Sequence, residues 1–279
     1  KGHKIFFNSD PINKNAVDYW LEKVPKKINK KFLFKNTDKN KFKSSNIEPI
    51  FIFGIPRSGT TLVETIITSG EEKIYNAGEN FIIQKALQNA QLNKKIYENE
   101  ESLEVDINFL RKNVIESYME NFSIKTEKLK FIDRTMTNFF FSEIILELFP
   151  NAKIINCKRD SFHNLVAIYQ QCLNNLPWSH NVQHIKKYIS LYNSKLKKIE
   201  KIYSKNILNV ELEKLTEFPE NTSKELMSFC NLKWSENVLK YYERKDLICT
   251  TASNIQIREK IFKYDRAKFL PYKEYFDNF

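Results

Sequence analysis

The sequence predicts an α/β fold in which helices flank a parallel β-sheet. Three apolar runs support this prediction, at 50–53, 129–133 and 153–157, each followed by a short polar turn and then by apolar residues at helical spacing. Runs of β-branched and aromatic residues of this length are typical of strands buried on both faces of a parallel sheet. Alternation of strand and helix indicates βαβ units. The 279 residues are enough for one such domain with insertions.

The segment before the first strand, residues 1–48, is rich in Lys and Asn. We expect it to be a partly helical N-terminal extension, with a helix over about 15–30 that Pro25 interrupts. Residues 92–128 are highly charged and predict a helical insertion. Further helices are predicted at 81–91, 139–149, 162–171 and 182–203, a fourth strand at 207–212, and a T-x-x-E capping box at 222–225.

The turn after the first strand has the composition of an anion-binding loop. The apolar run ends at Gly54, and Ile55-Pro56-Arg57-Ser58-Gly59-Thr60-Thr61 then leads into a helix. A strand, a glycine-containing loop and a helix N-terminus together present backbone N–H groups to a phosphate. Arginine adds a permanently charged fork, and the hydroxyl groups add donors. We therefore expect an anionic cofactor to contact Arg57, Ser58, Gly59, Thr60 and Thr61.

The glycine spacing of this loop is that of the nucleotide P-loop, G-x-x-x-x-G-K-[ST], but Thr60 stands where that motif has lysine. Without the lysine that reaches the β- and γ-phosphates, the loop favours an anionic nucleotide cofactor over ATP hydrolysis. The alternative for the loop alone is a βα turn with a helix cap.

The stretch G-x-P-R-S-G-T-T-L-x-E, at 54–64, resembles the 5′-phosphosulfate loop of sulfotransferases. It is most similar to bacterial enzymes that follow tetratricopeptide repeats and to tyrosylprotein sulfotransferases. The resemblance extends through several motifs and implies a sulfotransferase domain, with a P-loop-like parallel sheet, over 49–279. It also implies 3′-phosphoadenosine 5′-phosphosulfate (PAPS) as sulfonate donor and a hydroxyl-bearing acceptor. Because the chain starts at Lys1 and not at Met, we expect a fragment, which an upstream tetratricopeptide region can precede.

Two segments resemble the family's catalytic motifs. Ala77-Gly78-Glu79 matches an A-G-E segment, and the resemblance implies that Glu79 is the general base. From the residues alone, Glu79 is predicted to be a carboxylate at the start of a helix, where the helix dipole favours negative charge. After the second strand, Arg134 stands where the family has a lysine that contacts the sulfonate. The resemblance implies that Arg134 stabilises charge there, although an arginine cannot lose its proton. The alternative is a surface arginine.

The third strand leads into a segment that resembles the family's 3′-phosphate motif, R-D-P-x-D-x-x-x-S-x-Y. Arg159 matches the phosphate ligand, whereas Ala167 replaces the phosphate-binding serine. An arginine beside a helix N-terminus is a sound phosphate site even without that hydroxyl. Farther on, Leu212 stands where the family has a tyrosine near the adenine. The loss of the serine hydroxyl would weaken cofactor binding unless Ser161 or Lys158 compensates.

The C-terminal part carries two more matches. Residues 250–258, TTASNIQIR, resemble the family's T-A-S-x-x-Q-V-R segment, which implies that Ser253 reaches the sulfonate or the 5′-phosphate. Lys268 resembles a basic residue that closes over the 3′-phosphate.

Composition narrows the partners, metal sites and cellular locations that are expected for the protein. The net charge is +11, but the 45 Lys and Arg are spread along the chain, and no nucleic-acid-binding signature is present, so no nucleic acid is expected as partner. The four cysteines form no C-x-x-C pair, and no metal site is expected. No apolar stretch reaches the roughly 18 residues of a membrane span, and no signal peptide is visible. A reduced, cytoplasmic protein fits best.

These observations predict a PAPS-dependent sulfotransferase that acts on a tyrosyl side chain, a sugar or a small alcohol or phenol. Charge would be neutralised by arginines, hydroxyls and backbone N–H groups, without a metal. The alternative is a catalytically degenerate, sulfotransferase-like protein that binds a nucleotide or a partner, because Ala167, Leu212 and Arg134 depart from the family's pattern. A nucleoside-phosphate kinase and a nucleic-acid-binding module are further alternatives.

Overall fold

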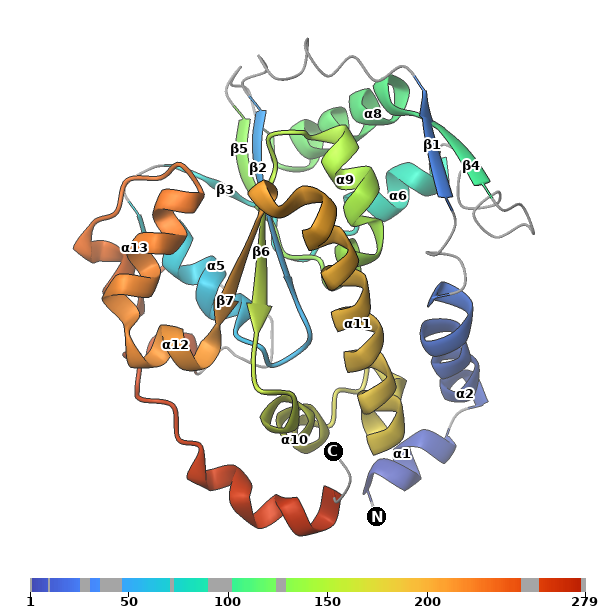
Figure 1. Ribbon diagram of the computed structural model, residues 1–279, viewed down its shortest axis with the longest axis vertical. Coiled ribbons are helices and arrows are strands. Elements are labelled where there is room, and N and C mark those ends of the chain that lie inside the picture. Colours follow the sequence, from blue (N-terminus) through green and yellow to red (C-terminus); the bar gives the residue numbers. More distant parts are fainter. Residues whose placement is uncertain are drawn as a thin grey trace.

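The structure is a computed structural model that describes residues 2–9, 11–25, 31–35, 47–70, 73–89, 102–123, 129–246 and 256–276. Its centre is a five-stranded sheet in the order β3-β5-β2-β6-β7, in which all neighbouring strands are parallel. Helices cover both faces of this sheet (Figure 1). The predicted α/β fold with a parallel central sheet is therefore confirmed. The strands are β2 (Ile47–Gly54), β3 (Tyr75–Asn76), β5 (Leu129–Asp133), β6 (Lys153–Lys158) and β7 (Ile207–Glu211).

Alternate residues of the central strand β2 supply two separate hydrophobic cores, because successive side chains of a strand point to opposite faces. Ile50 and Ile52 belong to the core beneath α5, α12 and α13, while Phe51 and Phe53 belong to the larger core beneath α8, α9 and α11. All four side chains are fully buried. The helices on the first face are α5 (Thr60–Thr68), α12 (Leu212–Glu217) and α13 (Pro219–Phe229), and those on the second are α8 (Ile107–Asn121), α9 (Ser142–Leu148) and α11 (Val182–Tyr203).

The N-terminal segment packs on the main domain. Helices α1 (Gly2–Ser9) and α2 (Pro11–Asp18) are followed by a π-helical turn, Tyr19–Lys23, whose Leu21 joins the larger core. The helix predicted over 15–30 thus begins earlier, at Pro11, and its part beyond Pro25 lies outside the described residues. Strands β1 (Lys31–Lys35) and β4 (Ser102–Asp106) form a small parallel pair that the sequence did not predict.

Most other predicted elements are present. Helix α11 has the predicted bounds, and α6 (Ile82–Asn89), α8 and α10 (Ser161–Gln171) lie in segments predicted to be helical. The predicted helix at 139–149 begins as a 3-10 turn, Met136–Phe141. The prediction of a capping box at 222–225 was wrong. Helix α13 starts three residues earlier, with Pro219 at its first position, where the fixed φ of proline suits a helix start.

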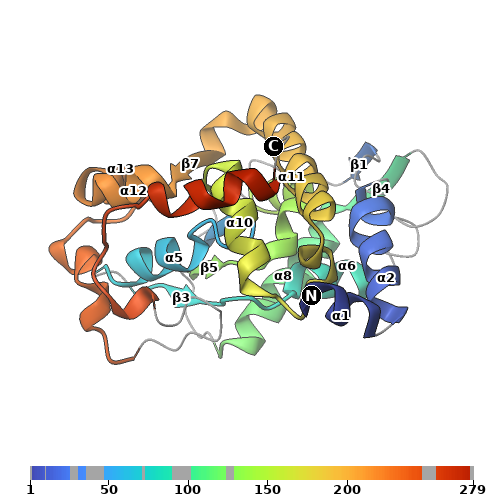
Figure 2. The same ribbon diagram turned by 90° about the horizontal axis from the view of Figure 1, so that it is seen from below.

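The C-terminal 3-10 segment η8 (Ala267–Phe276) crosses over α10, as the view from below shows (Figure 2). Phe276 of η8 contacts Phe162 of α10, with ring centroids 6.4 Å apart. This crossing brings the C-terminal part of the chain over the carboxyl ends of β2 and β6, where ligands of parallel α/β sheets bind. In the part of the chain that the structure describes, no helix is long and apolar enough to cross a bilayer.

Candidate functional site

The loop between β2 and α5 has a strained backbone that its glycines make feasible. Gly59 is the N-cap of α5 with φ of 94°, and a Cβ atom there would lie 2.9 Å from Cδ1 of Leu212. A Cβ atom on Gly54 would lie 2.4 Å from Thr60 and 2.5 Å from Ser58. Arg57 also has a left-handed φ, 70°, although it is not glycine. Such strain in non-glycine residues clusters at functional sites.

The conformation of Gly59 gives a stability prediction. Gly59→Ala should lower the free energy of unfolding by about 1–2 kcal/mol, because an L-residue pays that cost in the left-handed region. The shift can be measured by urea unfolding. Gly2→Ala is the matched control, because nothing lies within 4 Å of a Cβ atom at that position. An unchanged midpoint for Gly59→Ala would contradict the prediction.

Arg159, just after β6, holds this loop from the side. Its Nη1 donates to the backbone oxygen of Arg57 at 2.8 Å, and its Nε donates to Oη of Tyr264 at 2.7 Å. The guanidinium also lies over the ring of Phe269, 5.2 Å from its centroid. Nδ2 of Asn164, on α10, donates to the backbone oxygen of Pro56 at 2.8 Å. The loop is therefore fixed by two neighbouring elements.

Three cations converge beside the loop and repel one another. Burial lowers the pKa of Arg57, and the charge of Arg159 lowers it further. Burial also lowers the pKa of Lys268, with contributions from Arg159 and Arg57 that Asp265 opposes. Clustered positive charge of this kind costs free energy until an anion neutralises it. The place is therefore suited to a multiply charged anion.

A cavity of about 280 Å³ opens at these cations, and we call it the loop cavity. Arg57, Gly59, Arg159 and Lys268 line one part of it. The other lining residues include Ala167, Leu212 and several aromatic side chains: Tyr241, Phe262, Tyr264 and Phe269. Aromatic and apolar walls with a few charged groups are typical of sites for a flat, charged small molecule.

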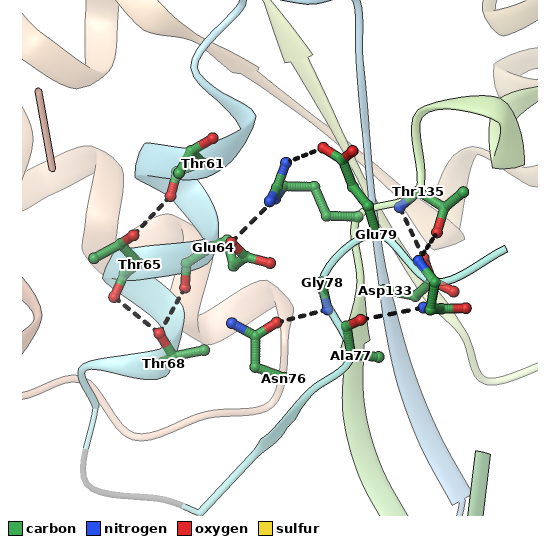
Figure 3. A network of polar contacts seen from close by, with 12 residues as sticks. Thr61, Glu64, Thr65, Thr68, Asn76, Ala77, Gly78, Glu79, Asp133 and Thr135 are labelled. Atoms are coloured by element: carbon green, nitrogen blue, oxygen red, sulfur yellow. Dashed lines mark hydrogen bonds and ion pairs between the residues drawn. The ribbon is translucent and has the colours of Figure 1, made fainter. Parts of the chain in front are cut away.

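A second cluster lies across α5, where one guanidinium binds two carboxylates. Nη1 of Arg134 is 2.6 Å from Oε1 of Glu79, and its Nε is 3.0 Å from Oε2 of Glu64. Figure 3 shows these carboxylates on either side of the guanidinium, Glu64 from α5 and Glu79 from the loop after β3. Arg134 and Glu64 are buried, whereas 44% of the Glu79 side chain is exposed. The exposed carboxylate is thus the one that a ligand can reach.

Burial controls the electrostatics of this cluster. It raises the pKa of Glu64, and the charge of Arg134 opposes that rise. Burial alone would lower the pKa of Arg134, but Glu64 and Glu79 together raise it above the usual value. Arg134 therefore stays charged throughout the working pH range.

Backbone hydrogen bonds set the position of Glu79 relative to Arg134. The N–H of Ala77 donates to Ile132 and the N–H of Arg134 donates to Gly78, both at 2.8 Å. The hydroxyl of Thr135 accepts the N–H of Asn80 at 3.0 Å. The loop after β3 is thus bound along the end of β5, which fixes the ion pair in place.

Glu79 and Arg134 line a second cavity, of about 420 Å³, which we call the Glu79 cavity. Thr61 and Glu64 of α5 also line it, and Ile257 lines both cavities. Both cavities therefore border the first turn of α5, through Gly59 and Leu62 in one and Thr61 in the other, where the macrodipole favours negative charge.

The structure brings most of the predicted site residues to these two cavities. Thr60 opens α5 beneath Gly54 and is half-buried. Ser58 is buried, and within the described part of the chain its hydroxyl oxygen has no hydrogen-bond partner. Ser253 lies outside the described residues. Among the residues that are described, no three His, Cys, Asp or Glu side chains gather as a metal site.

Sequence reasoning missed several residues of the site. Tyr264 and Phe269 hold Arg159, but they lie more than 100 residues from it in the sequence, and no local pattern connects them. Glu64 was the last letter of the loop motif and received no role. Its spacing of four residues from Thr60, on a helix that starts at the loop, was a usable signal for a side chain near the anion site.

Comparisons with known proteins agree with this arrangement. Two solved structures share the fold: the sulfotransferase domain of the olefin synthase of Synechococcus PCC 7002 and the sulfotransferase domain from the curacin biosynthetic pathway. The first has a TM-score of 0.56 and 17% identity, covering 82% of this chain and 88% of that one. The second has a TM-score of 0.50 and 16% identity, covering 79% and 85%.

Two relatives are similar in sequence. An uncharacterized protein of Aquifex aeolicus is 33% identical over 239 residues, which is 81% of this chain and 31% of that protein. A protein-tyrosine sulfotransferase of Drosophila melanogaster is 23% identical over 215 residues, 70% of this chain and 40% of that protein. The chain thus spans less than half the length of either relative. The model of the sulfotransferase family matches residues 49–236, so this chain belongs to the sulfotransferase family.

Proposed function

We propose that the protein transfers a sulfonate group from PAPS to an acceptor hydroxyl. One observation carries the proposal: three mutually repelling cations, Arg57, Arg159 and Lys268, line a single aromatic-walled cavity beside a helix N-terminus. PAPS carries a flat adenine base and two separate anionic groups. The aromatic walls of the cavity match the base, and its cations match the anionic groups. ATP hydrolysis is not favoured, because the loop lacks the P-loop lysine.

In this proposal the two anionic ends of PAPS bind at two strand ends. The 5′-phosphosulfate would lie at the N-terminus of α5, against Arg57, Ser58, Gly59, Thr60 and Thr61. The 3′-phosphate would bind Arg159 and Lys268. The adenine would pack on the aromatic part of the loop cavity. Ser253 remains a predicted ligand of the sulfonate end.

The chemistry would use Glu79 and Arg134. As the acceptor oxygen forms its bond to sulfur, Glu79 takes the hydroxyl proton and the bond from sulfur to the phosphate oxygen breaks. Oε1 of Glu79 is bound to Arg134, and its other oxygen has no hydrogen bond within the described residues, so it can accept that proton. Arg57 and Arg134 stabilise the developing charge through preorganised donors.

The first test is calorimetric titration with 3′-phosphoadenosine 5′-phosphate (PAP), the desulfonated donor, with ATP as control. This measurement is independent of the acceptor. We expect selective binding of PAP with a Kd in the micromolar range. A folded protein that binds neither nucleotide would refute the proposal.

The pKa of Lys268 gives a pH prediction. Because burial and neighbouring cations lower this pKa, the free protein loses the proton of Lys268 at lower pH than an ordinary lysine. A bound 3′-phosphate would raise the pKa again, so PAP binding should take up a proton at alkaline pH and weaken as the pH rises. Calorimetry in buffers of different ionisation enthalpy measures this uptake. Lys268→Gln should abolish it, and Lys273→Gln should not.

A second candidate is a degenerate, sulfotransferase-like binding protein. Ala167 and Leu212 both line the loop cavity, where the family's hydroxyl and aromatic ring are absent. This candidate predicts weak or no PAP binding and no effect of Glu79→Gln on any activity. Selective micromolar binding of PAP with acceptor turnover would exclude it.

A further inference from the structure

The Glu79 cavity is the place for the acceptor if the proposed function holds, and this inference rests on that function. Glu79 is the proposed base, and its carboxylate is the exposed member of the cluster with Arg134. Like the loop cavity, the Glu79 cavity is lined by Ile257 and by the first turn of α5, where the sulfonate would lie. An acceptor hydroxyl must therefore approach through the Glu79 cavity to lie between the base and the sulfur atom. A volume of about 420 Å³ lies within the range of small-molecule sites.

The two cavities differ in chemistry. Aromatic side chains line the loop cavity, whereas none of the described residues that line the Glu79 cavity is aromatic. Nine of the thirteen described residues that line the Glu79 cavity are polar: Thr61, Glu64, Thr65, Thr68, Asn76, Glu79, Arg134, Arg244 and Asp246. A flat phenol would gain little from such walls, because it needs apolar or aromatic surface to bury its ring. A molecule with many hydroxyl groups matches them better.

The hydroxyl groups of α5 in this cavity can accept hydrogen bonds from a ligand. Thr65 donates its hydroxyl proton to the backbone oxygen of Thr61 at 2.8 Å, and Thr68 donates to that of Glu64 at 3.0 Å. Their protons are used inside the helix, so only their oxygen lone pairs remain as acceptors, and Arg244 already donates to that of Thr68. The carboxylate of Glu64 also lines the cavity, buried beside Arg134 and Asn76. Figure 3 shows the hydroxyl groups of Thr61, Thr65 and Thr68 and this carboxylate together on α5.

Arg244 and Asp246 form the part of the cavity wall next to the C-terminal end of α5. Nη1 of Arg244 donates to the hydroxyls of Thr68 and Ser69 at 3.0 and 3.1 Å. The same guanidinium binds Asp246 by two bonds, from Nε to Oδ1 at 3.0 Å and from Nη2 to Oδ2 at 2.6 Å. This arrangement holds the carboxylate of Asp246, 71% exposed, at the rim of the cavity. Its pKa is lowered by the hydrogen bonds from Arg244, so it stays ionised.

The charge of the lining excludes one class of acceptor. Three carboxylates, Glu64, Glu79 and Asp246, line the cavity, against the two guanidiniums of Arg134 and Arg244. Both guanidiniums are already paired with carboxylates. With Glu64 ionised, the described residues of the lining carry one net negative charge, which repels an anionic acceptor such as an acidic peptide and favours a neutral or amino-bearing one.

From these observations we infer that the acceptor is a polyhydroxylated molecule of saccharide type, neutral or amino-substituted, and that Asp246 and Arg244 help to select it. The hydroxyl that receives the sulfonate lies against Glu79. Neighbouring hydroxyls or an amino group donate to the threonine oxygens and to Asp246.

The test compares four acceptors by transfer of labelled sulfonate from PAPS: methyl glucoside, methyl glucosaminide, p-nitrophenol and a tyrosine peptide flanked by glutamates. We expect kcat/KM for both glycosides to exceed that for the phenol at least tenfold, with the acidic peptide poorest. Saturation-transfer NMR on the PAP-loaded protein should detect binding of the glycosides. A faster phenol or peptide, or failure of both glycosides to bind the PAP-loaded protein, would overturn the inference.

Variants of Asp246, at the rim of the Glu79 cavity, distinguish an effect on acceptor specificity from an effect on folding. Asp246→Asn should raise the KM for the glucosaminide about tenfold while kcat changes little, since Asp246 does not touch the reacting atoms. Asp246→Lys should abolish any preference for the glucosaminide over the glucoside. The matched control is Glu236→Lys, because Glu236 is a similarly exposed acid that pairs with Lys240. This variant should change neither the KM for the glucosaminide nor the preference for the glucosaminide over the glucoside. Unaltered acceptor KM values in both Asp246 variants would also overturn the inference.

The same series distinguishes this inference from the proposed function. If PAP binds and the glycosides do not, the sulfotransferase proposal stands and the acceptor class is wrong. If PAP does not bind, the proposed function fails, and the acceptor inference fails with it.

Discussion

Arg57→Ala should reduce turnover by about 10²–10³-fold, the usual loss when one preorganised donor to a developing charge is removed. Arg57 lines the loop cavity beside Gly59 and approaches the place where the sulfonate and its leaving oxygen would lie. PAP affinity should fall as well, because a hydrogen bond to a charged group contributes about 1.5–3 kcal/mol. Steady-state sulfonate transfer and PAP calorimetry measure the two effects separately.

The ligand-free protein should keep its fold in this variant. Arg159 binds the backbone oxygen of Arg57, which alanine retains, and the repulsion between the two guanidiniums disappears. Circular dichroism without ligand should therefore give the spectrum of the unmodified protein. Arg57→Lys is the matched variant: it keeps the charge but loses the planar fork, so it should retain part of the activity. Turnover of Arg57→Ala equal to that of the unmodified protein would remove Arg57 from the site.

Features of the site that are contiguous in the chain could be predicted from the sequence. The loop at 54–61 could be predicted because its strand, glycines and helix start are contiguous in the chain. The strands at 129–133 and 153–157 could be predicted for the same reason: each is a short apolar run before a polar turn. Strands β2 and β6 are neighbours in the sheet, which places Arg57 beside Arg159. This proximity follows from the parallel topology and not from spacing in the sequence.

Features that depend on distant contacts could not be predicted. Strands β1 and β4 pair although about 70 residues separate them, and each has only five residues, two of which are charged. Tyr264 and Phe269 reach Arg159 only because the C-terminal segment folds back over α10. The false capping box has the opposite cause: a local pattern at 222–225 was real, but Pro219 had already started the helix.

Arg134 illustrates a case in which sequence reasoning found the residue but not its environment. From the sequence, this arginine in place of lysine keeps the charge but cannot lose its proton. The structure places that arginine between two acids: its Nη1 donates to Glu79, and its Nε forms an ion pair with Glu64. The substitution thus keeps a directed charge at the site, provided that Glu64 remains as its anchor.

Glu79→Gln should lower kcat by about 10²–10⁴-fold, the usual contribution of a general base. PAP affinity should change less than about threefold, because the loop cavity that would bind PAP does not include Glu79. Glutamine has nearly the same shape and can still accept a hydrogen bond from Arg134, so the cluster should keep its structure. The measurements are the pH–rate profile of sulfonate transfer, which should lose its acidic limb, and PAP calorimetry.

Glu64→Gln is the comparison that assigns the proton acceptor. Glu64 is buried behind Arg134, whereas Glu79 is exposed to the cavity. If Glu79 is the base, Glu64→Gln should lower stability, because a buried guanidinium loses one of its two charged partners, yet it should leave an acidic limb in the pH–rate profile. If Glu64 were the base, the acidic limb would vanish in Glu64→Gln and persist in Glu79→Gln. Full activity of Glu79→Gln with unchanged PAP affinity would exclude proton transfer to Glu79, and the ion pair with Arg134 would then be structural.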